Sequence, residues 1–148
     1  MVVVKVKTLS DNIEVPALAT VGSACFDLRA AHDAIVKPGE LSSIGTGLQM
    51  EIPEGYSLDL ISRSGFAFKH QTRLVNCYAI IDSDFRDEIK VGLFMDPSSA
   101  GQQQQLEIKA GDRIAQGRIV PVLKVQFDVV DELSKTDRKG GFGSTGIR

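Results

Sequence analysis

Short hydrophobic segments dominate the chain, and they alternate with polar positions and end at glycine or proline. Valine and isoleucine are frequent in them, and a period of two is typical of β-strands. Turn sequences such as Lys37-Pro38-Gly39-Glu40 and Pro53-Glu54-Gly55 separate them. The expected strands are Val2–Thr8, Phe26–Ala30, Ala34–Val36, Gly45–Ile52, Tyr56–Ile61, Leu74–Tyr78, Ile89–Met95, Leu106–Ile108 and Gln116–Val130. The pattern predicts an all-β domain, built as a sandwich, jelly roll or small barrel.

Three segments depart from this rhythm. Ile114–Val120 also fits a short helix, which Pro121 would end. Asp96–Gln105 contains small residues and four glutamines and is expected to be an exposed hairpin loop. From Lys135 onward, glycines and charged residues leave little apolar surface to bury. We therefore expect a folded core over residues 1–134 and a flexible arm over residues 135–148.

Composition and charge narrow the function. The chain has 148 residues, 17 Lys plus Arg and 19 Asp plus Glu, which gives a net charge of −2. This size fits one domain, and this charge disfavours a nucleic-acid-coating surface. No apolar run is long enough for a membrane span. Cys25, Cys77, His32 and His70 are isolated, so neither a zinc site nor a disulfide framework is expected, and a cytoplasmic location fits best.

The acidic segment Ile80–Glu88 is the first candidate for chemistry. Asp82 and Asp84 would point to the same side if the segment were a strand, and they could act as a base or bind a hard cation. A carboxylate beside Ile81 and Phe85 would be partly desolvated and a better proton acceptor. An Asp-rich hairpin turn explains the same residues. Both interpretations stay open on these residues alone.

The C-terminal glycines form the second candidate. Residues 141–146 spell G-x-G-x-x-G, but only Ile147 and Arg148 follow, so the helix of a dinucleotide-binding fold is absent. Glycine amides and the Ser144 hydroxyl can still donate hydrogen bonds to phosphate, together with Arg138. The Phe142 ring could cover a flat base. The alternative is a disordered tail.

Three further polar clusters end apolar runs. These are Gly22–Leu28 with Asp27, Ser62–Gly65, and Gly111–Gln116. Ser62–Gly65 and Gly111–Gln116 are similar to loops that bind phosphate, but each is also compatible with an ordinary turn that contains a salt-bridged arginine. Asp27 lies where a small-residue loop becomes a strand, and taken alone it is more typical of a structural residue than of a catalytic one. None of them identifies a function when it is taken alone.

The order of the clusters is more specific than any one of them. The sequence has F-D-L at 26–28, R-S-G at 63–65, I-D-S-D-F at 81–85, G-D-R-I-A-Q at 111–116 and G-G-F-G-S-T-G at 140–146. This order resembles the five motifs of the trimeric dUTP pyrophosphatase (dUTPase) family, from Gly22 to Gly146. The resemblance implies a jelly-roll-like β-barrel and a homotrimer in which each C-terminal arm closes a neighbour's site. It also implies Mg²⁺-dependent hydrolysis of dUTP to dUMP and pyrophosphate, which limits uracil in DNA and supplies dUMP for thymidylate synthesis.

The resemblance also assigns roles to individual residues. Asp82 matches the base that activates water, and Asp27 matches the carboxylate that holds Mg²⁺ through water. The implied substrate contacts fall into groups for phosphate, uracil, deoxyribose and the closing arm. They are Arg63, Ser64, Gly65 and Gln116 for phosphate, Asn76, Ile80 and Ile81 for uracil, Phe85 for deoxyribose, Lys90 on the next strand, and Arg138, Phe142, Gly143 and Ser144 in the arm.

Several positions depart from the usual motifs without removing a reacting group. They are Cys25, Ser62, Ala79, Phe85 and Asp87. Two alternatives therefore stay open beside the dUTPase. One is the related dCTP deaminase, and the other is a nucleotide-gated regulatory or binding trimer on the same barrel, with a protein partner that the sequence does not identify.

Overall fold

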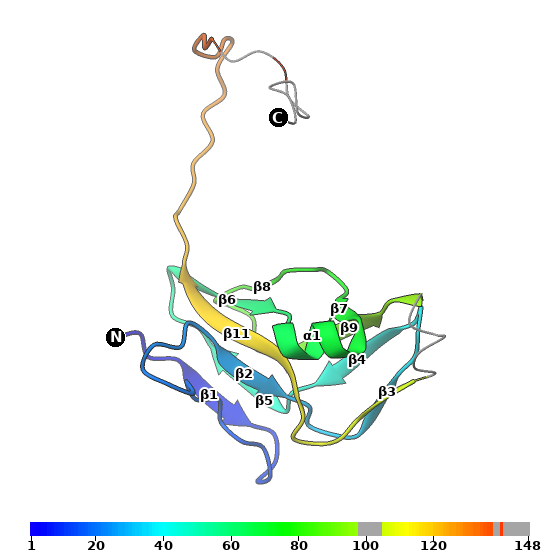
Figure 1. Ribbon diagram of the computed structural model, residues 1–148. Coiled ribbons are helices and arrows are strands. Elements are labelled where there is room, and N and C mark those ends of the chain that lie inside the picture. Colours follow the sequence, from blue (N-terminus) through cyan, green and yellow to red (C-terminus); the bar gives the residue numbers. More distant parts are fainter. Residues whose placement is uncertain (98–104, 138–139, 141–148) are drawn as a thin grey trace.

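The computed structural model describes residues 1–97, 105–137 and 140, and it has one helix and eleven strands within that part of the chain (Figure 1). The only helix there is α1 (Ser64–His70). The strands are β1 (Lys5–Thr8), β2 (Phe26–Arg29), β3 (Ala34–Val36), β4 (Leu41–Gly45), β5 (Leu48–Glu51), β6 (Tyr56–Ile61), β7 (Thr72–Leu74), β8 (Ala79–Ile81), β9 (Lys90–Met95), β10 (Leu106–Ile108) and β11 (Arg113–Pro121).

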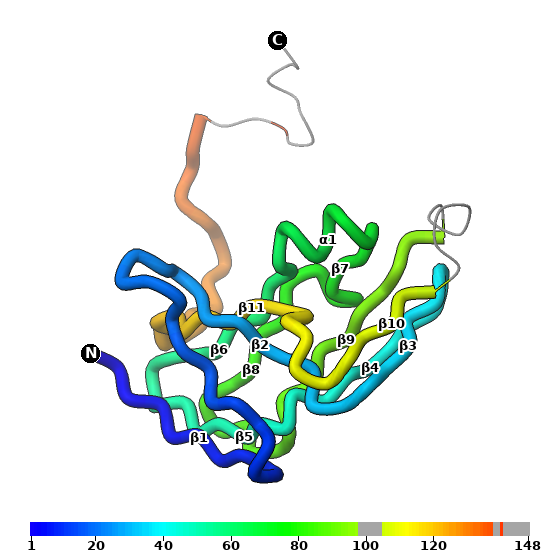
Figure 2. Tube along the Cα trace, turned by 60° about the horizontal axis from the view of Figure 1, so that its bottom comes forward, coloured from blue at the N-terminus to red at the C-terminus, as the bar shows by residue number. Residues whose placement is uncertain are grey.

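The strands form four small antiparallel sheets around one core. The largest has the order β2-β11-β6-β8, a second has the order β4-β9-β7, and the pairs β1-β5 and β10-β3 complete the barrel. The two outer pairs lie at opposite ends of the molecule (Figures 1 and 2). The predicted all-β fold class is thus confirmed.

The core consists of the inward-facing residues of these sheets. Leu28, Leu58, Val91 and Met95 are fully buried, as alternation along their strands requires. Gly117 on β11 belongs to the same packing, because a Cβ there would lie 2.6 Å from the Phe26 ring. A larger side chain at 117 would therefore displace this ring from the core.

Two expected strands are each interrupted by a turn in the left-handed backbone region. Gly45–Ile52 contains Gly47 at φ 67°, so β4 ends before it and β5 begins after it. Leu74–Tyr78 contains Cys77 at φ 59°, so only Leu74 belongs to a strand, the end of β7, and the strand prediction was wrong for the turn that follows it. A non-glycine residue rarely adopts this conformation, and for that reason the sequence pattern does not reveal it.

Other differences concern the ends of elements. The helical alternative for Ile114–Val120 is wrong, because this segment belongs to β11, which pairs with both β2 and β6. The expected strand Gln116–Val130 ends at Pro121. Helix α1 was not expected, and its seven residues separate β6 from β7. No helix of the described chain is long and apolar enough to span a membrane.

After β11 the chain runs away from the barrel (Figure 1). The Val122 N–H donates to the Gly55 carbonyl at 2.8 Å, and β11 has ended by then. Beyond it, Leu123, Phe127 and Val129 are more than four-fifths exposed. A series of exposed apolar side chains on one extended segment is typical of an interaction surface.

A carboxylate outside the candidate site provides a test of pH-dependent stability. Asp33 accepts a hydrogen bond from the Ala110 N–H at 2.9 Å and pairs with Lys109 Nζ at 3.0 Å. The backbone hydrogen bond, followed by the bond to Lys109, lowers the pKa of Asp33 below its ordinary value of 3.8. A carboxyl with a lowered pKa stabilises the fold above its unfolded pKa, and this contribution is lost as the pH falls through the folded pKa.

We expect Asp33→Asn to lower the melting temperature at neutral pH, because the amide has no charge to pair with Lys109. The difference in melting temperature between the variant and the parent protein should shrink as the pH falls below about 4. Thermal unfolding, followed by circular dichroism from neutral pH to below about pH 4, measures this difference. Asp11→Asn is the matched control, because Asp11 is exposed and the described residues show no ion pair to it. A difference that is independent of pH would contradict the prediction.

Candidate functional site

The outward face of the largest sheet brings several predicted residues together. Gln116 on β11 lies directly opposite Asp27 on β2 and Ile61 on β6. Residues that are directly opposite in antiparallel strands point to the same face. The F-D-L, R-S-G and G-D-R-I-A-Q clusters therefore meet on one surface, although they lie far apart along the chain.

Asp27 is the centre of a charged cluster on this face. Arg63 Nε donates to Asp27 Oδ1 at 2.6 Å, and Arg113 Nη1 donates to Asp27 Oδ2 at 3.2 Å. The Asp27 side chain is 22% exposed, so solvent screens these pairs only in part. Two guanidinium groups against one carboxylate leave a local positive charge. We call these three residues the Asp27 cluster, and its charge suits an anionic ligand.

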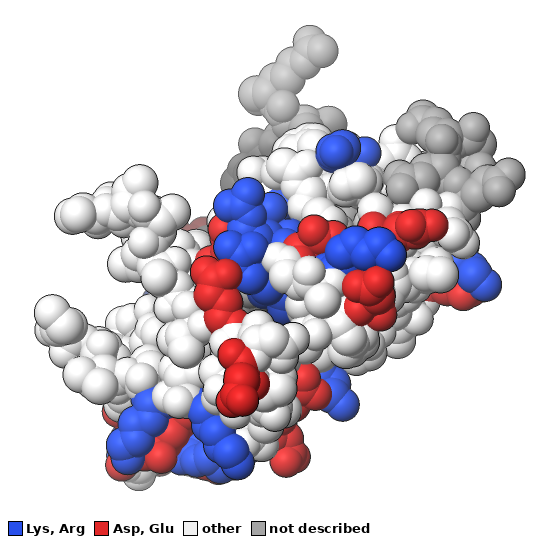
Figure 3. Space-filling model, turned by 90° about the horizontal axis from the view of Figure 1, so that it is seen from below, with Lys and Arg blue, Asp and Glu red and all other residues white. Residues whose placement is uncertain are grey.

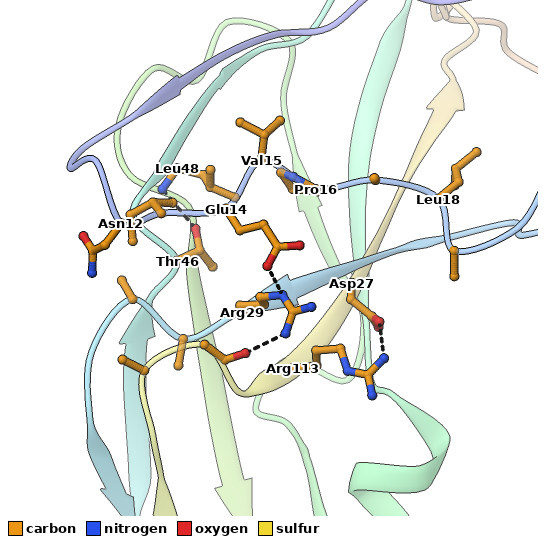
Figure 4. Close-up of a pocket in the computed structure, with 17 residues that line it drawn as sticks. Asn12, Glu14, Val15, Pro16, Leu18, Asp27, Arg29, Thr46, Leu48 and Arg113 are labelled. Carbon is orange, nitrogen blue, oxygen red and sulfur yellow. Dashed lines mark hydrogen bonds and ion pairs between the residues drawn. The ribbon is translucent and has the colours of Figure 1, made fainter.

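The Asp27 cluster lies beside a hollow of about 380 Å³ between the 12–19 segment and β2 (Figure 4). Arg29 and Glu14 close one side of it, with Arg29 Nε and Glu14 Oε2 3.1 Å apart. Arg29 Nη1 also donates to the Gly111 carbonyl at 2.8 Å. The hollow is thus lined by two charged pairs, Arg29 with Glu14 and Arg113 with Asp27.

The Ser62–Gly65 segment provides small exposed groups next to Arg63. Ser64 and Gly65 are both exposed in the first turn of α1. Ser62, one of the departures from the usual motif, has a structural role because its Oγ accepts a hydrogen bond from the Leu74 N–H at 3.2 Å. This bond holds the loop against the end of β7.

Asp82 lies in a different place, directly after β8. The Asp82 carbonyl accepts a hydrogen bond from the Phe85 N–H at 3.2 Å, which closes a turn that we call the Asp82 turn. The turn interpretation is therefore confirmed, and the alternation of Asp82 with Asp84 on one strand face was wrong. The Asp82 side chain is exposed, so the expected desolvation by Ile81 and Phe85 does not occur within the chain.

The other residues expected to contact the substrate surround the Asp82 turn. Asn76 is exposed in the turn before β8, and Ile80 is 60% exposed on β8 itself, whereas Ile81 is partly buried. Phe85 is 36% exposed at the end of the Asp82 turn. Lys90 is exposed at the start of β9, opposite Gly45. The predicted arm residues Arg138, Phe142, Gly143 and Ser144 lie outside the described residues.

The structure does not join the Asp82 turn to the Asp27 cluster. Asp82 and Ile80 line a second hollow, of about 860 Å³, with the β5–β6 turn. No described residue lines both this hollow and the one beside Asp27. One chain therefore presents two separate groups of candidate residues.

Arg113 is a residue of the site that the sequence reasoning did not single out. It lies within G-D-R-I-A-Q, so the signal was present, but its partner Asp27 is 86 positions away.

Charges on the face seen in Figure 3 are mixed, and the described residues of this face form no broad basic surface.

Comparison with known proteins identifies the family. A family model described as dUTPase matches residues 11–146. The deoxyuridine 5'-triphosphate nucleotidohydrolase of Nautilia profundicola is 47% identical over 143 residues, which cover 96% of this chain and 97% of that protein. The protein of the same name from Finegoldia magna is 40% identical over 96% of this chain and 99% of its own length. The chain belongs to the dUTPase family.

Solved structures agree with this family. The dUTPase of Staphylococcus bacteriophage 80alpha with dUpNHpp has a TM-score of 0.87 at 26% identity and covers 98% of this chain and 99% of its own. A mutant dUTPase from phage phi11 of Staphylococcus aureus, described with a structural Mg(II) ion, has a TM-score of 0.80 at 24% identity. The match covers 88% of this chain and 97% of that chain. The predicted family and its enzyme class, dUTP diphosphatase, are confirmed, and the deaminase alternative is set aside.

Asp27 is the carboxylate of this site that fits a hydrated divalent cation bound to a triphosphate. No group of three His, Cys, Asp or Glu side chains in the described chain could hold a metal ion. Asp27 already accepts hydrogen bonds from two arginines. A carboxylate in this position can bind the water shell of Mg²⁺, which that ion gives up reluctantly.

Proposed function

We propose that this dUTPase-family chain hydrolyses Mg²⁺-bound dUTP to dUMP and pyrophosphate, with Asp82 as the general base. The observation that carries the proposal is the division of the family motifs between two surfaces. The Asp27 cluster supplies positive charge for a triphosphate, and the Asp82 turn supplies an exposed carboxylate for a water molecule. Each surface alone lacks what the other provides.

In the proposed reaction, Asp82 accepts a proton from a water molecule whose oxygen attacks the α-phosphorus of dUTP. A bond forms between this oxygen and the α-phosphorus. The bond from the α-phosphorus to the oxygen that bridges the α- and β-phosphates breaks, and its electron pair leaves with pyrophosphate. A positioned general base of this kind accounts for about 10²–10⁴-fold in rate.

The phosphate side of the reaction uses the Asp27 cluster and its neighbours. Arg63 and Ser64 would contact the phosphates and steady the negative charge that develops on the leaving group, and Gln116 would contact them from β11. Mg²⁺ bound to the substrate would neutralise part of the triphosphate charge. Asp27 would hold the hydration shell of this ion while Arg113 keeps the carboxylate in place.

The pyrimidine side of the reaction uses the edge of the largest sheet. β8 is the last strand of this sheet and pairs only with β6 there. The backbone N–H and C=O groups on the outer edge of β8, which come from every second residue of the Ile80–Ile81 segment and its neighbours, are thus available to read a uracil edge, together with Asn76. Phe85 would pack on the deoxyribose, and Lys90 would be a further substrate contact.

A second and a third copy would complete the site. The two hollows of one chain are separate, and the extended segment after Val122 exposes apolar side chains that a neighbouring chain would cover. We therefore propose a homotrimer with a core over residues 1–134. The arm over residues 135–148 would close a neighbour's site with Arg138, Phe142, Gly143 and Ser144, and a cytoplasmic location fits the free thiols of Cys25 and Cys77.

A substrate panel tests the proposal. We expect pyrophosphate release from dUTP in the presence of Mg²⁺, and little release from dTTP, dCTP, dATP or dGTP, because the β8 edge would recognise uracil and leave no room for the 5-methyl group of thymine. Chelation of the metal should remove the activity. Equal turnover of dTTP and dUTP, or tight binding of dUTP without hydrolysis, would contradict it, and the second outcome would indicate a regulatory trimer.

A further inference from the structure

A buried aspartate on β6 is not used by the proposed reaction. Asp59 is 2% exposed, although it lies on the outward face of the sheet, directly opposite Arg118 on β11 and Ile80 on β8. A carboxylate that is removed from water costs free energy unless it is paired and hydrogen-bonded. A residue of this kind on the face that carries Gln116 therefore needs an explanation.

Asp59 is the centre of a closed polar network. Ser57 Oγ donates to Asp59 Oδ1 at 3.1 Å, and the Tyr78 hydroxyl donates to Asp59 Oδ2. Arg118 Nε lies 3.6 Å from Asp59 Oδ2, and Arg118 Nη2 donates to the Tyr78 hydroxyl at 3.2 Å. The hydrogen bond with Tyr78 raises the pKa of Arg118, which stays charged. The network links β6, β11 and the turn before β8.

The position of Tyr78 gives this network a consequence for the substrate. Tyr78 lies between Asn76 and Ile80, two of the three residues expected to read uracil, and its N–H donates to the Asn76 carbonyl at 2.6 Å. Between Asn76 and Tyr78, Cys77 adopts the left-handed conformation that non-glycine residues rarely adopt. A turn with such a residue persists only where its surroundings hold it.

We propose that Tyr78, anchored by Asp59 and Arg118, is a positioning residue that fixes the pyrimidine-reading edge and thereby sets the selectivity for the base. The inference rests on the proposed function, because it names the residue that lets the same site distinguish uracil from other bases. Tyr78 acts here through Asn76 and the β8 backbone. Its hydroxyl holds the turn against β6 and β11, so the reading groups keep one spacing.

The test compares Tyr78→Phe and Asp59→Asn with the parent protein. Tyr78→Phe deletes only the anchoring hydroxyl, and we expect the KM for dUTP to rise about tenfold, which is the lower end of the effect of losing a hydrogen bond to a charged group. The kcat should change less than the KM, because Asp82 is untouched. The ratio of kcat/KM for dUTP to that for dCTP should fall, since a loosened edge reads both bases less sharply.

Binding and a matched control separate this role from general stability. The Kd of dUpNHpp, measured by calorimetry, should rise in parallel with KM. Asp33→Asn removes an ion-paired carboxylate on another loop and should lower the melting temperature without changing base selectivity. If Asp59→Asn fails to fold, Tyr78→Phe still decides the question.

Two outcomes would overturn the inference. If the parent protein hydrolyses dUTP and Tyr78→Phe keeps both its KM and its dUTP to dCTP ratio, the positioning role is wrong and the proposed function stands. If the parent protein neither hydrolyses dUTP nor binds dUpNHpp, the inference and the proposed function both fail.

Discussion

Replacing Asp82 with asparagine is expected to slow dUTP hydrolysis by about 10²–10⁴-fold, the contribution of a positioned general base. The amide is close to the carboxylate in size, but it cannot accept the proton of the attacking water. Binding should persist, because the groups assigned to phosphate and uracil are unchanged. Pyrophosphate release under saturating Mg²⁺ and dUTP measures the first effect, and calorimetry with dUpNHpp measures the second.

The neighbouring carboxylate provides the control for this prediction. Asp84 is exposed in the Asp82 turn, and the two aspartates carry the same charge. Asp84→Asn makes the same chemical change in the same turn, so a general effect of lost negative charge would appear in both variants. If Asp84→Asn lost as much activity as Asp82→Asn, or if Asp82→Asn kept its activity, the assigned base would be wrong.

The motifs were visible in the sequence because each is local. Arg63, Ser64 and Gly65 are consecutive, and Asp82 lies in one short segment. The pairing of Asp27 with Arg63 and Arg113 was not visible, because it depends on the register between β2, β11 and the end of β6. Similarly, alternation placed Leu74–Tyr78 on a strand, since nothing in its composition shows that Cys77 takes a left-handed backbone.

One error in the expected strands is informative. Hydrophobic alternation runs from β11 past Pro121 to Val130, and it predicted a single strand up to that residue. In the chain alone, Val125, Phe127 and Val129 are exposed on an extended segment without strand pairing. Alternation of this kind is typical of a strand with one buried face. The pattern in this segment therefore fits contacts with another chain, as the proposed trimer requires.

Mixing two inactive variants tests whether the site is shared between chains. Asp82→Asn removes the proposed base, and Arg63→Ala removes a proposed phosphate contact of the Asp27 cluster. If each site takes Asp82 from one chain and Arg63 from another, a mixed trimer contains sites in which both residues are intact. With equal amounts and random assembly, each of the two chains contributes its intact residue in half of the cases. The mixture should then regain about a quarter of the parent activity.

The controls for this experiment follow from the same geometry. Each variant assayed alone should stay inactive, and a mixture that cannot exchange subunits should stay inactive as well. A double variant with both changes on one chain, mixed with the parent protein, should also form some intact sites, because the parent chains supply both residues. A chain that ends at residue 134 and carries neither substitution should still exchange subunits. Its activity shows how much the arm contributes beyond the contacts between the barrels. If the mixed variants gain no activity after confirmed exchange, Asp82 and Arg63 act within one chain. The Asp82 turn would then have to move toward the Asp27 cluster for both residues to reach one substrate.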